Sequence, residues 1–146
     1  MPLLKCSRGF LWLLMSLAAF PALGEESPVQ ELRGRLLHVW RGEYECPQGA
    51  TGIDVSLDEV ADNFVVRGSF SFHNLPGMSN ARSGAYLLIG RFDPGTKRLQ
   101  MEPFGWIRQP AGYVMIGFTV SPSPDWSALE GLIDKEAGCS TIALRR

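Results

Sequence analysis

Few side chains in this sequence have the chemistry of a catalytic acid, base or nucleophile. The chain has two histidines, His38 and His73, and general acid-base catalysis needs a histidine that a carboxylate orients. His73 lies at the end of a predicted strand and could face Asp54 or Asp58 across a sheet, as in a hydrolase or an isomerase. We expect instead that both histidines are hydrogen-bonded surface or rim residues.

Sequence motifs of the common enzyme classes are missing. The chain contains no Gly-x-Ser-x-Gly elbow, no His-Glu-x-x-His motif, no phosphate-binding loop and no dinucleotide fingerprint. Its histidines and cysteines lie at spacings unrelated to those of a zinc site. The sequence therefore predicts a protein that is not an enzyme and that holds no metal and no cofactor.

Aromatic side chains are better candidates for function, because flat amphipathic rings bind proteins and sugars with little loss of side-chain entropy. Two long connections, predicted over 73–83 and 103–112, carry apolar residues, and long loops on a rigid sheet often bind ligands. Packing at the end of a barrel is the alternative role for such rings, Trp40 included. The predicted binding residues are Met78, Phe104, Trp106, Arg108, Tyr113 and Trp126.

Residues 1–24 have the pattern of a secretory signal peptide. Lys5 and Arg8 precede an apolar run over 10–20, and small residues follow before Gly24. The run is shorter than the roughly 20 residues that span a membrane as a helix, so we expect cleavage after Gly24 and no membrane anchor thereafter. The prediction is a periplasmic or secreted protein.

Charge also limits the class of partner. The formal net charge of the chain is −1, and loss of the basic residues of the signal peptide would make it more negative. A chain with this slightly negative net charge is not expected to bind the negatively charged backbone of nucleic acid. We expect a protein or glycan partner in the cell envelope.

The cysteine pattern predicts one disulfide. The chain has three cysteines, and Cys6 would leave with the signal peptide. An isolated pair in an oxidising compartment is a disulfide by default, which would link Cys46 to Cys139. Closing so long a loop restricts the unfolded chain by up to about 4 to 5 kcal/mol.

A short helix is predicted after the signal peptide, within a lead-in over 25–41. Ser27 is placed to cap it, Pro28 suits its first turn, and Gln30 completes a capping box. Apolar residues then recur at spacings of three or four as far as Trp40. We expect this helix to end at Gly42 and to cover one opening of a sheet.

From Gly42 the apolar period changes to two, which is typical of strands. The predicted strands cover 43–46, 53–58, 64–73, 85–92, 99–101, 113–120, 129–133 and 139–144. About eight short strands with local turns favour an all-β antiparallel meander over 42–146, closed as a small barrel or a flattened sandwich. In a closed meander the first and last strands are neighbours, which suits the predicted disulfide.

Two segments carry a resemblance to a known domain. Residues 40–46 (WRGEYEC) and 106–113 (WIRQPAGY) resemble segments of a small exported bacterial β-domain that also occurs beside caspase-like domains. The resemblance covers residues 40–145 and implies export, but it implies no established activity. The expected architecture is also similar to that of periplasmic lysozyme inhibitors and of barrel inhibitors of secreted metalloproteases, with no inhibitory motif in common.

These observations favour a non-catalytic exported binding module, such as an inhibitor, that recognises a protein or a glycan through long aromatic loops. The alternative is a lipocalin-like carrier of a small apolar ligand, whose cavity would be lined by Phe64, Phe70, Phe72, Tyr86 and Leu88. A barrel of eight strands is at the size where side chains either fill the interior or leave room for one small ligand. The volume of the interior separates these two hypotheses.

Overall fold

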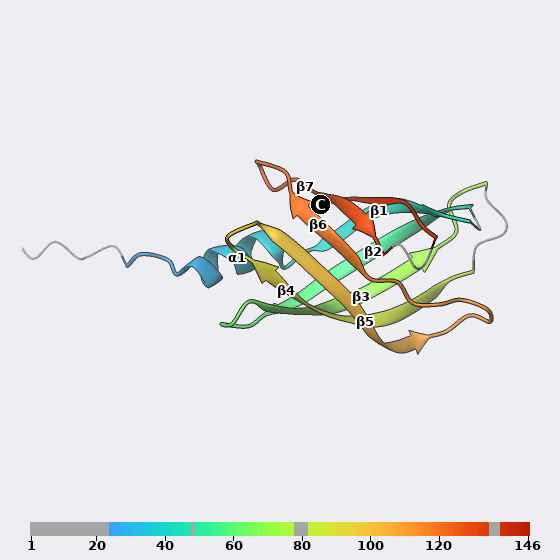
Figure 1. The fold of residues 1–146 in the computed structure, drawn as a ribbon, viewed down its shortest axis with the longest axis horizontal. Helices are drawn as coiled ribbons and strands as arrows, with labels where there is room; N and C mark the ends of the chain where they lie inside the picture. The colour runs from blue at the N-terminus through green and yellow to red at the C-terminus, as the bar shows by residue number, and fades with distance from the viewer. Residues whose placement is uncertain (1–23, 48, 78–81, 135–137) are drawn as a thin grey trace, which may run out of the picture.

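The chain forms a closed antiparallel barrel of eight strands in which each strand pairs with the next and β8 pairs with β1 (Figure 1). This computed structural model describes residues 24–47, 49–77, 82–134 and 138–146. The strands are β1 (Val39–Cys46), β2 (Gly49–Val60), β3 (Val65–His73), β4 (Gly84–Asp93), β5 (Arg98–Arg108), β6 (Phe118–Pro122), β7 (Ala128–Ile133) and β8 (Thr141–Arg145). The predicted all-β meander is confirmed, and it is a barrel rather than a flattened sandwich.

The predicted helix forms, but it is shorter than expected. Helix α1 covers Pro28–Leu36, and the Ser27 hydroxyl accepts a hydrogen bond from the Gln30 amide. Leu37 leaves the helical conformation and β1 begins at Val39. Trp40 therefore belongs to a strand, although its indole nitrogen still donates to the Leu36 carbonyl at 3.0 Å. Tertiary pairing of β1 with β2 and β8 overrides the helical spacing in this segment.

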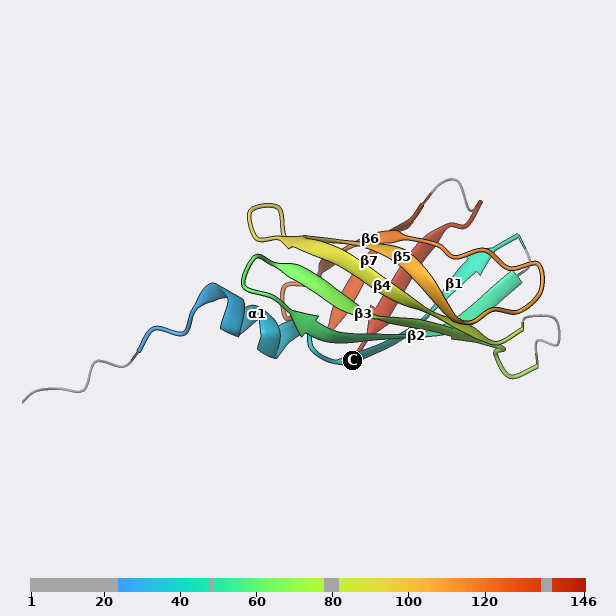
Figure 2. The same ribbon diagram turned by 90° about the horizontal axis from the view of Figure 1, so that it is seen from below.

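Helix α1 lies across one end of the barrel, as Figure 2 shows. Leu32 and Leu36 are buried in the core, and Arg33 donates to the Val60 carbonyl at the end of β2. The turns between β2 and β3, β4 and β5, and β6 and β7 lie at this end, which we call the closed end. Among the described residues, no helix has the length and apolar character needed to cross a membrane.

The barrel interior is filled by large side chains. Phe70 is fully buried near the centre, and its ring stacks on that of Tyr86 with centroids 4.8 Å apart. Trp40, Leu88 and Met101 are also fully buried, so no water-sized space lies against them. The alternating apolar residues seen in the sequence thus form a packed core.

The connection between β5 and β6 differs from the prediction. Strand β5 continues to Arg108, through the predicted loop over 103–112, whereas β6 begins only at Phe118. Two bulges allow β5 to stay paired with β4 past Pro103. By contrast, β5 pairs with β6 only over Leu99–Met101, so residues 109–117 form the long loop.

Candidate binding site at the open end

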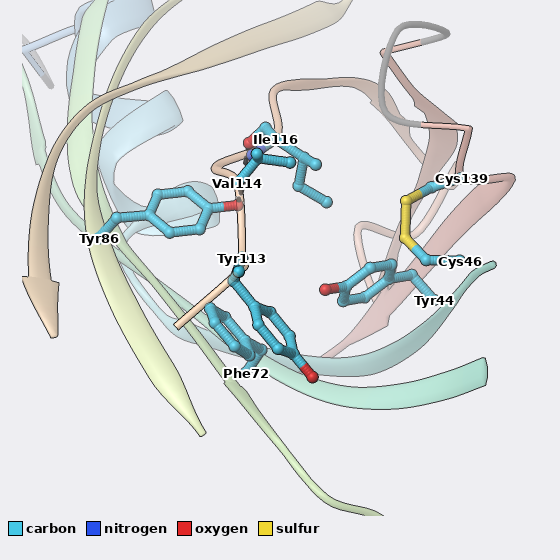
Figure 3. A pocket seen from close by; sticks show the side chains of 9 residues that line it. Tyr44, Cys46, Phe72, Tyr86, Tyr113, Val114, Ile116 and Cys139 are labelled. Atoms are coloured by element: carbon cyan, nitrogen blue, oxygen red, sulfur yellow. Dashed lines mark hydrogen bonds between the residues drawn. A yellow bond between two sulfur atoms is a disulfide. The ribbon is translucent and has the colours of Figure 1, made fainter. Parts of the chain in front are cut away.

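The end of the barrel opposite α1, which we call the open end, contains a pocket of about 160 Å³. Rings, aliphatic side chains and the disulfide line it, as Figure 3 shows. The lining residues are Tyr44, Cys46, Phe72, Tyr86, Gly112, Tyr113, Val114, Ile116 and Cys139. The site is therefore mainly apolar, and the phenol hydroxyls of its tyrosines are among its polar groups.

Strand alternation places the walls of this pocket. Tyr44 on β1, Phe72 on β3 and Tyr86 on β4 are each buried between more exposed neighbours, which is the pattern of inward-facing positions. Tyr44 and Tyr86 point toward the pocket from opposite sides (Figure 3). The segment from Tyr113 to Ile116 supplies the remaining wall.

An aromatic cluster fixes that remaining wall. Tyr113 stacks on Phe72 with ring centroids 5.4 Å apart and an interplanar angle of 6°. Trp106 meets Phe72 and Tyr86 edge to face, at centroid distances of 6.3 and 5.4 Å. Such pairs stabilise by roughly 0.5–1.5 kcal/mol each beyond area burial, so the pocket is largely preformed.

The Tyr86 hydroxyl takes the place of a partner strand for the segment before β6. It donates to the Ile116 carbonyl at 2.9 Å and accepts from the Ile116 amide at 3.3 Å. Both groups are buried, and buried backbone groups need partners. These two hydrogen bonds hold Ile116 over the mouth of the barrel.

Replacing Tyr86 with phenylalanine is expected to lower the free energy of unfolding by about 1–3 kcal/mol, because both Ile116 backbone groups would lose their partner while buried. Denaturant unfolding measures the loss, and hydrogen exchange at the Ile116 amide should become faster. Tyr113→Phe is the matched control, since the one partner of the Tyr113 hydroxyl among the described residues is the exposed Arg82 amide, from which it accepts. An equal loss in both variants would contradict this role of Tyr86.

Burial changes the acidity of two phenols in the pocket. Desolvation, and then the neighbouring Tyr113, raises the pKa of Tyr44 to about 12, although the nearby Thr51 hydroxyl opposes the rise. Desolvation also raises the pKa of Tyr86 well above its ordinary value, and the bond to the Ile116 backbone opposes this shift. Both phenols stay protonated and neutral in the folded protein at neutral pH.

The protein is expected to lose stability as the pH rises above about 10. Unfolded tyrosines ionise near pH 10, whereas folded Tyr44 ionises at about 12. The unfolded state therefore loses its proton first, which lowers its free energy relative to that of the folded state. Below pH 10 the contribution of this group is fully present. Unfolding midpoints measured from pH 8 to 12 test this, and Tyr44→Phe should flatten part of the decline.

The structure brings some of the predicted binding residues together. Trp106 and Tyr113 belong to the aromatic cluster at the pocket, and Phe104 and Arg108 are exposed on the same half of β5. Met78 lies outside the described residues.

Trp126 lies at the closed end, away from these residues. Its ring packs on Phe92 at 6.0 Å, with the Arg35 guanidinium 5.3 Å above it. Trp126 therefore stabilises the helix-covered end and takes no part in the pocket.

Tyr44, Tyr86 and Ile116 line the pocket but were not among the residues predicted to bind a partner, and Tyr86 was expected only to line the cavity of a carrier. The inward alternation of the first two was visible in the sequence, but nothing in the sequence distinguished a mouth residue from a core residue. Ile116 lies in a segment for which a strand was predicted.

The histidines have surroundings unlike those of a catalytic base. His38 Nε2 lies 3.0 Å from the Gly34 carbonyl and 3.4 Å from the Arg146 guanidinium. His73 is exposed and its backbone pairs opposite Gly52, and its imidazole has no hydrogen bond or ion pair within the described part of the chain. Asp54, one of its suggested partners, pairs with Arg41 at 3.5 Å.

The predicted disulfide is present and forms one side of the pocket. Cys46 at the end of β1 joins Cys139 before β8, with Cα atoms 4.1 Å apart. The β1–β8 ladder extends only from Arg41 to Tyr44 on the β1 side, so the disulfide holds these strands together beyond the last paired residue.

Comparisons with known proteins identify no relative of this chain. No family model, no curated protein and no solved structure matches the chain.

Proposed function

We propose that this protein is a non-catalytic, exported binding module whose open end takes one apolar side chain of a protein partner. The observation that carries the proposal is the preformed pocket of about 160 Å³ lined by rings and aliphatic groups. Buried aromatic or aliphatic anchors in such pockets supply much of the energy of protein recognition. Export is supported by the disulfide between Cys46 and Cys139 and by the signal-peptide pattern of residues 1–24.

The size of the pocket favours a single side chain over a carried ligand. An apolar cavity of about 150 Å³ is large enough for a benzene molecule, whereas sites for larger ligands occupy about 300–1,000 Å³. The packed interior around Phe70 and Leu88 offers no further depth. A ring or a branched aliphatic group of a partner fits this volume better than a lipid does.

The orientation of the rings favours a protein over a glycan. Sugars stack on open aromatic faces, but one face of Phe72 is covered by Tyr113 and one face of Tyr86 is covered by Phe70. Val114 lies beside the pocket with 72% of its surface exposed. A partner's side chain that enters the pocket would therefore also contact Val114 and cover part of its exposed surface.

A charge placed at the rim tests the proposal. Val114→Glu is expected to abolish capture of the partner from cell-envelope extract, because the carboxylate would need to be desolvated on binding. Leu132→Glu is the matched control, since Leu132 is an aliphatic residue on β7 with 61% exposure. Capture lost in the first variant and kept in the second supports the proposal, and equal behaviour of the two variants contradicts it.

A direct ligand measurement separates side-chain recognition from the other two classes. N-acetyl-phenylalanine amide at millimolar concentration is expected to shift the amide resonances of residues 112–116, and the shifts should be absent in Val114→Glu. Shifts with a glycan fragment alone would favour sugar recognition. A stabilising effect of a long-chain fatty acid would favour a carrier, since a ligand that binds only the folded state raises its stability.

A further inference from the structure

Half of strand β5 has a free edge, even though the barrel is closed. On the β4 side, β5 is paired from Arg98 to Arg108. On its other side it pairs with β6 only over Leu99–Met101, which leaves residues 102–108 without a ladder in a stretch that the structure describes throughout. Unpaired N–H and C=O groups along a strand are a template for another strand.

The following loop does not occupy this edge. Tyr113 is held on Phe72 by stacking, and the Ile116 backbone bonds to the Tyr86 hydroxyl. Among the described backbone hydrogen bonds, none joins residues 109–117 to residues 102–108. Within the described ranges, the hydrogen-bonding groups of this edge are therefore free to pair with a strand of another chain.

Two bulges expose apolar side chains along this edge. Leu88 pairs with Pro103 and Leu87 with Gly105, so Phe104 is an extra residue, and Ile107 is extra in the same way. Phe104 is 53% exposed and Ile107 is 58% exposed. An association along the edge would cover both of them.

The charges along the edge are self-complementary. Glu102, Gly105 and Arg108 pair with residues on the outer face of β4, so the bulges place one charge on each side of a central glycine on the same face. Arg108 has no ion pair within the described ranges. An antiparallel pairing of two such edges about Gly105 brings Glu102 of each copy opposite Arg108 of the other.

We infer that two copies of this chain associate through their β5 edges in a symmetric, antiparallel pairing centred on Gly105. The same patch then serves on both subunits, as a two-fold interface requires. Opposite charges placed across a strand pair stabilise it, and like charges destabilise it. Pro103 lacks an N–H and removes one donor in each copy, which a strand edge tolerates.

A charge swap tests this pairing. Sedimentation of the purified protein, obtained by expressing the full chain, is expected to give twice the mass of one chain. Glu102→Arg alone and Arg108→Glu alone should each weaken the association by about tenfold or more, because each places like charges opposite one another twice. The double variant Glu102→Arg/Arg108→Glu should restore it.

Arg98→Glu is the matched control, because Arg98 lies at the opposite end of β5, beyond the residues that pair with β6, and it should leave the association unchanged. Thermal midpoints of dilute samples show that each variant is folded. A single-chain mass for the wild type at the highest concentration reached overturns the inference. So does a double variant that stays as weak as the single ones, or an equal effect of Arg98→Glu.

Discussion

Removing the disulfide between Cys46 and Cys139 is expected to lower the free energy of unfolding by about 2–5 kcal/mol. The bond closes a loop with a sequence separation of 93, so most of the domain lies within it and the unfolded chain is strongly restricted. It also holds the ends of β1 and β8 beyond their last paired residues. A loss of this size is a large share of the 5–15 kcal/mol that stabilises a typical domain.

Denaturant unfolding of wild type and Cys46→Ser/Cys139→Ser, with and without a thiol reductant, measures this contribution. The reductant should lower the wild-type midpoint to that of the double variant and should not affect the double variant. Denatured but unreduced wild type should show no reactive thiol at either position. Two reactive thiols, or equal midpoints of wild type and double variant, would contradict the expected contribution.

The architecture could be predicted because the apolar pattern and the cysteines constrain it together. Alternation of period two predicted the strands, and a disulfide between Cys46 and Cys139 required the first and last strands to be close. The pairing of β1 with β8 confirms that proximity. Barrel and sandwich could not be separated from the sequence, because the same alternation suits both.

The details of the open end could not be predicted, because they depend on contacts distant in the sequence. The Tyr86 hydroxyl lies 30 positions from the Ile116 backbone that it bonds, and this contact replaces the strand pairing expected near Tyr113. Likewise, the strand continues through Pro103 because bulges opposite β4 accommodate it. No local pattern marks either arrangement.

The positions of Trp106 and Trp126 in the barrel also could not be predicted from the sequence. Both lie near prolines in the sequence, and both were interpreted as loop aromatics suited to binding. The closed topology places alternate turns at opposite ends of the barrel, so one ring joins the pocket and the other packs beneath α1. Residue type and local composition do not show at which end of the barrel a turn lies. That assignment requires the number of strands before the turn, which was uncertain from the sequence.

Whether the interior is filled or hollow decides between the two classes of function, and Phe70→Ala tests it. Phe70 is fully buried and contacts the rings of four neighbours, which are Tyr44, Phe72, Tyr86 and Phe118. Truncation in a packed core removes transfer energy and leaves a cavity, so we expect a loss of about 3–5 kcal/mol in the free energy of unfolding. A hollow barrel would lose much less, because its ring would already face empty space.

Phe104→Ala is the matched control, because it removes the same atoms from a half-exposed position on β5. At protein concentrations that keep single chains, its effect should stay within about 0.5 kcal/mol, as for most surface substitutions. The new cavity in Phe70→Ala should also bind benzene and regain part of the lost thermal stability, since dry apolar cavities of this size accept it. A loss below about 1.5 kcal/mol in Phe70→Ala, with benzene stabilising the wild type instead, would show that the barrel already holds an internal cavity and would favour a carrier.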